Sequence, residues 1–413
     1  MCLPLKITKM LNNKKIALVY DRVNTPFGGA EKVLLALKKL YPQADLFTAV
    51  YNPRKAKWAK VFKIKTSFLQ KFPLAKHHHR LLAPLMPLAF ETLDLGDYDV
   101  IISITSAEAK GIITRSDQLH FCYLLTPPRY LYHYQENYWN KIAFLNWPII
   151  KHISKKALQY LKKWDQLAIH RPDVIVPISQ AVANRIHKYY HLESHPVIYP
   201  PVDLDVFQAL LAAHPSTNHQ KNQYYLLVSR LVPYKNIDLA IKACVRLGRQ
   251  LIIVGDGPDY RQLKKLAKKL LSQRADFPKN SKQIIFQKQV NNEQLSQLYG
   301  HARALLMPGI DDFGIVGLEA SLHSLPVLIH QHAGASEVLA DGQYSLHLNF
   351  PEIMLEEHSE KYVEELCQKM KILEETDFDL EILAKNAIKY DTTSFLRRFN
   401  RQLEAAYRKK FDE

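Results

Sequence analysis

The chain has 413 residues, of which 47% are apolar and 23% are charged, so its composition is that of a folded globular protein rather than a disordered or fibrous one. It carries 56 lysines and arginines against 40 aspartates and glutamates, and the formal net charge of +16 favours anionic partners. Its 4 cysteines are scattered without a CxxC pair, which excludes a disulfide framework and a cysteine zinc site and is typical of a reducing compartment.

Export and membrane insertion are both disfavoured by the sequence. The first residues, MCLPLKITKM, lack the apolar core of a signal peptide, and Met10 is an alternative start. The longest near-candidate for a membrane span, Leu81–Phe90, is far shorter than the roughly 20 residues required and contains two prolines. We therefore expect an intracellular protein.

In the first half of the chain, short apolar runs alternate with longer stretches of helical spacing. Such runs are typical of strands that are buried on both faces of a parallel sheet. The expected strands are Lys15–Tyr20, Leu46–Val50, Asp99–Ile104, Leu119–Leu125, Asp173–Pro177 and Val197–Tyr199. Helical periodicity follows Gly29 and Ser179.

A strongly basic segment lies within this half. Leu46–Phe90 contains nine lysines and arginines, three consecutive histidines and no acidic residue, and Lys151–Lys163 holds five further lysines without an acid. Such a run is often only a solvated face. Large apolar residues between the lysines, among them Trp58, Phe62, Phe68 and Phe72, instead favour the headgroup region of an anionic membrane.

The second half repeats the alternation more regularly. Its expected strands are Tyr224–Val228, Leu251–Val254, Ile284–Phe286, Ala304–Met307 and Pro326–Ile329, and its expected helices lie near Ile237–Leu247, Tyr260–Leu271, Asn292–His301 and Gly314–His323. Gln208–Gln223 has the composition of a linker. We therefore predict two Rossmann-like α/β domains, residues 1–207 and 208–385, followed by a helical segment, 386–413, that packs back on the first domain. Ligands of such sheets bind at the carboxyl ends of the strands, which points to the cleft between the two domains.

The first candidate site follows the first strand. Gly28 and Gly29 open a helix, whose free backbone N–H groups suit a phosphate or a sugar. An ordinary tight turn explains the same pair. Because the segment is not a GxGxxG fingerprint, a nicotinamide-dependent dehydrogenase is disfavoured.

Two cations follow the strand Tyr224–Val228. Arg230 and Lys235 stand before a helix, where they would neutralise a diphosphate, although a solvated loop has the same composition. Gly255 and Gly257, at the end of the next strand, permit close approach of the backbone to a ligand.

The most informative stretch is MPGIDDFGIVGLEASLHSLPVL. Here Gly314, Ile315 and Val316 start a helix, and their free N–H groups suit a phosphate. Asp311 and Glu319 add two carboxylates that can accept hydrogen bonds from hydroxyl groups, unless the aspartate merely caps the helix.

Taken together, these motifs resemble a known enzyme family. FGGAEKVL, LVSRLVPYKNIDLAI, LIIVGDGPDYRQL and DDFGIVGLEASLHSLPVL look like family-4 retaining glycosyltransferases of the GT-B fold, in which two Rossmann-like domains face each other across a cleft. HFCYLLTPPRYLY, DVIVPISQAVANRIHKYY and VIYPPVDLDVF resemble the mannosyltransferase-like branch that builds bacterial surface polysaccharides such as lipopolysaccharide.

The resemblance implies catalytic roles for four residues. Arg230 and Lys235 would hold the donor diphosphate, Glu319 would accept from the ribose hydroxyls, and Asp311 stands where the family has a glutamate that grips the hexose. No metal or cofactor is implied, because cations and a helix dipole stabilise the departing nucleotide instead. Retention would proceed by front-face attack, with a phosphate oxygen of the leaving group accepting the proton of the acceptor.

Further positions would bind the donor. Phe313, Gly314, Ile315 and Val316 would lie against sugar and phosphate, and Gly255 and Gly257 would border the site. Gly28 and Gly29 would let the loop of the first domain approach the donor.

The sequence departs from the family in several places. Leu125 replaces a histidine that usually precedes the threonine of the TP motif, and Asp311 is one methylene shorter than the usual glutamate. Gly317 replaces a common proline, and Ala333 a common glycine. His120 and His133 are near Leu125 in sequence, but an isolated histidine is more often structural.

The resemblance implies a metal-independent, retaining hexosyltransferase that uses a nucleotide-sugar, best GDP-mannose, and acts on a lipid-linked or membrane-anchored glycan. It would be cytoplasmic and peripheral on the inner face of the cytoplasmic membrane. The alternative is a non-catalytic subunit that binds a sugar-nucleotide or glycan. A nucleic-acid partner is disfavoured, since no recognition motif accompanies the charge.

Overall fold

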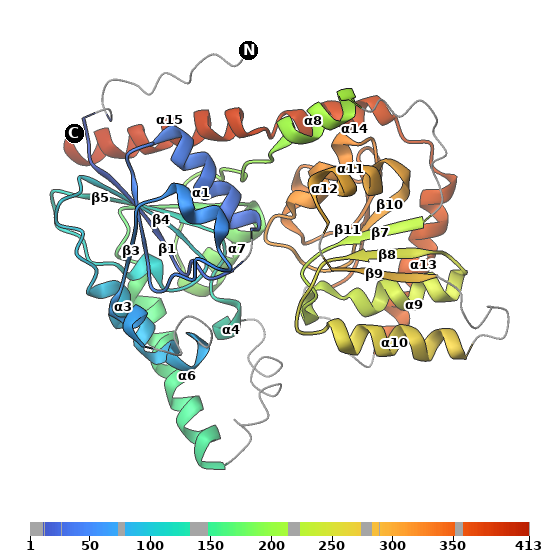
Figure 1. Cartoon of the computed structure of the whole chain (residues 1–413), viewed down its shortest axis with the longest axis horizontal. Coiled ribbons are helices and arrows are strands. Elements are labelled where there is room, and N and C mark those ends of the chain that lie inside the picture. The colour runs from blue at the N-terminus through green and yellow to red at the C-terminus, as the bar shows by residue number, and fades with distance from the viewer. Residues whose placement is uncertain are drawn as a thin grey trace. The chain divides into compact units, whose positions relative to one another are not determined.

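A computed structural model gives the fold (Figure 1). It describes residues 11, 13–25, 27–72, 79–132, 148–213, 224–273, 283–288, 290–351 and 358–412. The chain divides into two compact units, one made of Met1–Pro201 with Thr393–Glu413 and the other of Val202–Thr392. The chain passes from the first unit to the second after residue 201, six residues before the expected boundary at 207. It returns to the first unit at residue 393, whereas the terminal segment was expected to begin at 386.

The first unit is built on a parallel six-stranded sheet with the order β3-β2-β1-β4-β5-β6. Its strands are β1 (Ile16–Tyr20), β2 (Asp45–Thr48), β3 (Ile64–Thr66), β4 (Val100–Thr105), β5 (Leu119–Leu124) and β6 (Val174–Pro177). Val197–Tyr199, expected as a strand, is not one. Beside β6, the N–H groups of His195 and Ile198 donate to the carbonyls of Ile175 and Pro177 at 2.9 and 3.2 Å, which does not make a regular ladder.

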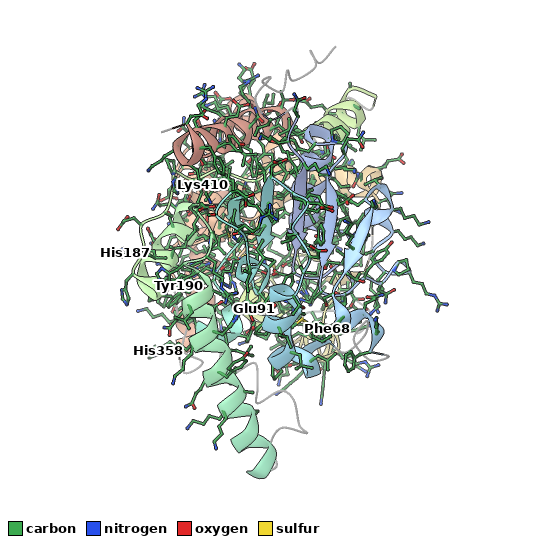
Figure 2. All side chains as sticks on the ribbon, turned by 90° about the vertical axis from the view of Figure 1, so that its left-hand side faces the viewer. Phe68, Glu91, His187, Tyr190, His358 and Lys410 are labelled. Atoms are coloured by element: carbon green, nitrogen blue, oxygen red, sulfur yellow. The ribbon has the colours of Figure 1, made fainter. Side chains whose placement is uncertain are left out.

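Helices connect and cover these strands. They are α1 (Gly29–Leu40), α3 (Met86–Glu91), α4 (Arg129–Tyr132), α6 (Pro148–Ala168), α7 (Gln180–Tyr190) and α15 (Thr392–Phe411). The terminal helix α15 packs on one face of the sheet, where Phe399 meets Phe121 with ring centroids 5.1 Å apart. Near its end Lys410, labelled in Figure 2, donates to Asp173 at 2.7 Å. This packing explains why α15 belongs to the first unit although it ends the chain.

The second unit repeats the design with the order β12-β11-β10-β7-β8-β9, again all parallel. Its strands are β7 (Tyr224–Val228), β8 (Leu251–Val254), β9 (Ile284–Gln287), β10 (Ala302–Met307), β11 (Val327–His330) and β12 (Ser345–Leu348). The predicted α/β class with two parallel sheets is confirmed. Two edge strands, β3 and β12, were missed by the sequence analysis, because each is short and contains polar residues.

Seven helices of the described residues belong to the second unit. They are α8 (Leu204–Ala213), α9 (Ile237–Leu247), α10 (Tyr260–Ser272), α11 (Asn292–His301), α12 (Ile315–Leu322), α13 (Ser359–Glu375) and α14 (Leu380–Ile388). In Figure 1, α9 and α10 cover one face of the sheet, and α11 and α12 cover the other. The expected linker 208–223 is wrong in its first part, because α8 extends to Ala213 and buries Leu204 and Phe207.

The described helices include none that is long and apolar enough to cross a bilayer.

Candidate functional site

The second unit gathers the predicted site residues at one edge of its sheet. The strand order reverses between β7 and β10, and a ligand of a doubly wound sheet binds at the carboxyl ends of the strands beside such a reversal. The loops that follow β7 and β10 meet there. A Cβ atom at Gly309 would overlap the backbone of Tyr234 and Lys235, and Asn236 donates to the Pro308 carbonyl at 3.1 Å.

Lys235 and Asp311 form an ion pair across these two loops. Lys235 ends a short 3-10 helix, Pro233–Lys235, and its side chain is 13% exposed, against 20% for Asp311. The sequence analysis assigned the lysine to the diphosphate and the aspartate to the hexose, and the structure places the two groups in contact. This contact is evidence that both residues belong to one site.

Arg230 follows β7 on the same edge of the sheet. Its side chain is exposed, and among the described residues no hydrogen bond or ion pair of the guanidinium group is found. The backbone on both sides of Arg230 packs closely against two glycines of the neighbouring loop. A Cβ at Gly255 would overlap the Ser229 carbonyl, and a Cβ at Gly257 would overlap the Leu231 carbonyl. These glycines therefore have a packing role beside Arg230. Their contact with the donor stays a prediction.

The start of α12 presents backbone N–H groups at this edge. Gly314 is the residue before the helix, has φ +99°, which favours glycine, and provides no side-chain cap. Ile315 and Val316 are partly exposed, whereas the Phe313 ring is only 3% exposed. Phe313 therefore presents its backbone rather than its ring. The helix terminus suits a phosphate by its dipole and its unsatisfied donors.

Glu319 points from α12 into the interior of the second unit. It is 3% exposed, and the hydroxyl of Tyr299 in α11 donates to its Oε2 at 3.1 Å. Burial raises the pKa of Tyr299 well above its ordinary value, and the negative charge of Glu319 adds to this rise. The phenol therefore stays protonated and remains a hydrogen-bond donor. A ligand contact of Glu319 stays a prediction, and Tyr299 was missed because an aromatic residue at helical spacing is more often a core residue.

His323 anchors the same helix. Its Nδ1 lies 2.7 Å from the Glu319 carbonyl oxygen and its Nε2 lies 2.8 Å from Ser296 Oγ. Burial lowers the pKa of this ring, so the neutral form is favoured at neutral pH. The hydrogen bonds of His323 thus fix the turn of α12 that carries Glu319.

In the first unit, the glycine pair opens α1 as expected. Gly28 is the residue before the helix, and Glu31 in the first turn is 5% exposed and accepts from Tyr20 at 2.9 Å and Thr25 at 3.2 Å. A Cβ at Gly28 would lie only 3.0 Å from Glu31 Oε2. A carboxylate thus lies at this helix terminus, and the contact of the glycine pair with the donor stays a prediction.

The described histidine nearest in sequence does not replace the one that the family places at position 125. Leu125 directly follows β5 and is half-buried. His120 lies inside β5 with 0% exposure, its Nε2 2.8 Å from Ser103 Oγ, and burial lowers its pKa to about 3. His120 is therefore a core residue, and His133 lies outside the described residues.

Comparison with known proteins identifies the second unit. Residues 212–376 match the family described as glycosyl transferases group 1. This segment is a group 1 glycosyltransferase domain. All the residues that the sequence analysis assigned as catalytic lie within it.

Two curated relatives are mannosyltransferases by name. The chain is 30% identical over 195 residues to the O-antigen chain mannosyltransferase RfbU of Salmonella typhimurium, covering 46% of this chain and 50% of RfbU. It is 28% identical over 193 residues to a GDP-mannose-dependent phosphatidylinositol monomannoside mannosyltransferase of Mycolicibacterium smegmatis, covering 41% and 47%. The chain thus spans about half the length of the curated relatives it matches.

A solved structure extends the likeness beyond the group 1 domain. HepE of Anabaena, in complex with UDP and glucose, has a TM-score of 0.60 and 18% identity, covering 95% of this chain and 99% of HepE. At this identity the likeness concerns the fold alone. Together with the two parallel sheets, it shows that the chain has the GT-B fold.

Proposed function

We propose that this protein is a retaining glycosyltransferase that moves a hexose, best mannose, from a nucleotide-sugar to a lipid-linked or membrane-anchored glycan. The observation that carries the proposal is the meeting of Arg230, the Lys235–Asp311 pair and the uncapped start of α12 at the reversal point of the group 1 domain. Two cations and a helix terminus suit a diphosphate, and a carboxylate suits sugar hydroxyls.

The chemistry follows from these charges. Cleavage of the sugar–phosphate bond leaves negative charge on the nucleoside diphosphate, which Arg230, Lys235 and the N–H groups at Gly314 would stabilise as it develops. Asp311 would hold the hexose beside them. We propose front-face attack, in which a phosphate oxygen of the leaving group takes the proton of the acceptor hydroxyl and no metal or cofactor is needed.

The names of both curated relatives favour mannose, and that of the Mycolicibacterium smegmatis enzyme names GDP-mannose as the donor, whereas HepE was solved with UDP and glucose. A thermal-shift panel of GDP-mannose, UDP-glucose, UDP-galactose and the free nucleotides separates these possibilities, because a ligand of the native state raises its apparent stability. Turnover should persist in excess EDTA. Activity restored only by added Mg²⁺ or Mn²⁺ would contradict the metal-free proposal and would make Asp312 a ligand candidate.

A non-catalytic sugar-nucleotide-binding subunit is the second candidate, favoured by Leu125 and by the shorter Asp311. Such a protein would bind the donor without hydrolysing it or transferring the sugar. Donor hydrolysis measured with purified protein and membrane extracts as acceptor distinguishes the two. We expect turnover, since Glu319 and both cations of the diphosphate site are present.

We also propose that the basic segment of the first unit meets an anionic membrane from the cytoplasmic side. Phe62 is buried and Trp58 half-buried, so the segment presents fewer aromatic rings than its sequence suggests. Exposed apolar groups nevertheless lie among the lysines, with Val61 58%, Phe72 44% and Leu88 48% exposed. Such a mixture suits the interfacial region of a bilayer.

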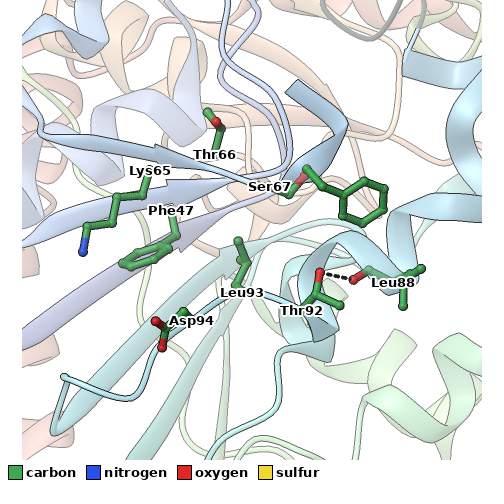
Figure 3. Close-up of a pocket in the computed structure, with 9 residues that line it drawn as sticks. Phe47, Lys65, Thr66, Ser67, Leu88, Thr92, Leu93 and Asp94 are labelled. Atoms are coloured by element: carbon green, nitrogen blue, oxygen red, sulfur yellow. Dashed lines mark hydrogen bonds between the residues drawn. The ribbon is translucent and has the colours of Figure 1, made fainter. Parts of the chain in front are cut away.

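A hollow of about 660 Å³ lies beside this face, between β3 and α3 (Figure 3). Phe47, Leu88 and Leu93 contribute apolar walls, and Lys65 stands at one side. Lys65 is held by Asp45 at 3.3 Å and donates to the Tyr98 hydroxyl at 2.9 Å, so it belongs to the structure of the wall. The hollow offers room for an apolar group, with the charged side chains of Lys65 and Asp94 in its lining.

Liposome co-sedimentation tests the membrane proposal. Lys57, Lys60 and Lys63 are exposed, and their replacement by glutamate should release the protein from anionic vesicles at low salt, since each basic residue near such a surface contributes about 1 kcal/mol. A matched control changes three exposed lysines of α10 in the same way, Lys265, Lys268 and Lys269. Equal loss in both variants, or no binding by the wild type, would contradict the proposal.

A further inference from the structure

The hollow between β3 and α3 lies at the outer edge of the first sheet (Figure 3). In the order β3-β2-β1-β4-β5-β6, β3 is the edge strand, whereas the order reverses between β1 and β4. A ligand that takes part in the chemistry of a doubly wound sheet binds beside such a reversal. The hollow is lined by β3 and β2 instead, and its volume of about 660 Å³ is that of a site for a small ligand.

Four apolar side chains form the walls of the hollow. Phe47 lies on β2 and is 2% exposed, and Phe68 begins the 3-10 helix that follows β3. Leu88 on α3 and Leu93 just after it form the opposite wall. Leu88 is 48% exposed, so an apolar ligand in the hollow would remove part of this side chain from water.

Three polar side chains of the lining already make hydrogen bonds within the protein. Ser67 Oγ donates to the Ala49 carbonyl at 2.9 Å, and Thr92 Oγ1 donates to the Leu88 carbonyl at 2.8 Å. Lys65 is engaged by the ion pair and the hydrogen bond described above. A sugar would have to compete for these groups, whereas a hydrocarbon needs none of them.

The charges of the lining also oppose an anionic ligand inside the hollow. Lys65 is paired with Asp45, and Asp94 adds an exposed carboxylate to the lining. A phosphate placed there would meet Asp94 and a lysine that is already paired. An anionic headgroup is therefore expected to stay outside the hollow.

Apolar surface continues from the hollow to the face that we assign to the membrane. The Phe68 ring packs edge to face against Phe72, with the centroids 6.4 Å apart, and Phe72 is 44% exposed. Leu88 is both a wall of the hollow and one of the exposed apolar groups of that face. An alkyl chain can thus lie in the hollow while its headgroup remains in the interfacial region of the bilayer.

We propose that this hollow takes up one hydrocarbon chain of a membrane lipid, with the headgroup of the lipid outside. The inference rests on the membrane contact within the proposed function, and it names the part of the lipid that is bound. We assign the chain to a lipid of the bilayer rather than to a substrate, because the hollow is not lined by the strands at the reversal point.

Monomeric lysophospholipids test the hollow without a membrane and without a donor. Ligand-observed NMR titrations of the full chain, below the critical micelle concentration, would compare lysophosphatidylcholines with chains of eight, ten and twelve carbons. Lysophosphatidylglycerols of the same lengths vary the headgroup, and glycerophosphocholine lacks the chain. We expect affinity to rise by up to about fourfold per methylene for both headgroups, from about 0.8 kcal/mol per buried CH₂. Affinity independent of chain length, or binding of glycerophosphocholine as tight as that of the lysolipids, would overturn the proposal.

Variants locate the chain. Thr92→Trp should weaken the ten-carbon lysolipid by about tenfold, because the indole occupies the space that the chain would fill. Thr376→Trp is the matched control, since the Thr376 hydroxyl likewise donates to the carbonyl four residues earlier, that of Ile372 at 2.7 Å, and lies outside the hollow. Equal affinities of the two variants would overturn the assignment. Leu88→Ser, expected to weaken the lysolipid about threefold, decides the question if Thr92→Trp does not fold.

The glutamate variant of Lys57, Lys60 and Lys63 separates this site from the basic face. These lysines do not line the hollow, so the variant should keep its affinity for the monomeric lysolipid while it is released from vesicles. Loss of lysolipid binding in that variant would overturn the proposal. If the wild type ignored vesicles yet bound lysolipids with the expected chain dependence, the membrane contact would fail and the chain site would stand.

Discussion

Replacing Asp311 by asparagine tests whether Lys235 is a cation that an internal ion pair holds ready for a diphosphate. The two groups are in contact, with side chains 20% and 13% exposed. A bound diphosphate must share Lys235 with that carboxylate or displace it. Asparagine keeps the shape of the side chain and removes its charge, so the lysine is left for the ligand.

The expected gain follows from the strength of the ion pair. Partly exposed pairs contribute about 0.2–1 kcal/mol, and the low exposure of both partners places this one near the upper value. About 1 kcal/mol corresponds to roughly fivefold in a dissociation constant. We therefore expect Asp311→Asn to bind GDP about fivefold more tightly than the wild type, yet to transfer the sugar more slowly, because a contact to the hexose is lost.

Isothermal titration calorimetry with GDP measures the first effect, and initial rates with the preferred donor measure the second. Asp312→Asn is the matched control, since it removes the carboxylate next in sequence and leaves the Lys235–Asp311 pair in place. The gain should vanish when Asp311→Asn is combined with Lys235→Ala. Unchanged or weaker GDP binding by Asp311→Asn, in a variant with native circular dichroism, would refute the reasoning.

Three further predictions follow from the same structure. Arg230→Ala and Lys235→Ala should each weaken GDP binding by about 1.5–3 kcal/mol, measured by calorimetry, because each removes a charge-assisted contact, and unchanged affinity in both would remove the diphosphate assignment. Tyr299→Phe should raise the KM for the donor more than it lowers kcat, because Glu319 loses the donor at 3.1 Å that orients it, whereas a purely structural role would lower the amount of folded enzyme and leave KM unchanged. His120→Gln should flatten the acid dependence of stability: burial lowers the pKa of the ring from 6.5 to about 3, so the unfolded chain binds more protons between these values, and the wild type should lose about 1.4 kcal/mol of unfolding free energy per pH unit below 6.5. Denaturant unfolding of the wild type and of His120→Gln at pH 7 and pH 5 checks this prediction. His120 alone should lower the unfolding free energy of the wild type by about 2 kcal/mol between these pH values, and an equal loss in both proteins would contradict it.

Local patterning in the sequence was enough to determine most of the fold. Strands such as Tyr224–Val228 and Leu251–Val254 are continuous apolar runs, and the structure has them at the expected residues. Prediction failed for Ile64–Thr66, three residues at a sheet edge that include a lysine, since an edge strand pairs on one side and need not be apolar. It also failed for Val197–Tyr199, which lies beside β6 without forming a regular backbone ladder with it.

Local patterning was also enough to find the motifs assigned to the donor. Gly314 and its neighbours follow a strand and open a helix, so a short segment contains all that the prediction of a phosphate site required. Asp311 was found because it stands in the same segment. The resemblance of these motifs to a glycosyltransferase family then supplied the reaction, which pattern alone does not specify.

Only the tertiary structure decided which of these side chains act on one another. Lys235 meets Asp311, Tyr299 donates to Glu319, and Arg22 lies beside Glu108 across 86 residues of chain. The first and third contacts join segments that follow neighbouring strands of a sheet, and the second joins the helices α11 and α12. Neither residue type nor spacing encodes these adjacencies. Burial was equally invisible, since the carboxylate of Glu108 and the ring of His120 have ordinary sequence surroundings and acquire their chemistry only when the sheets and helices close over them.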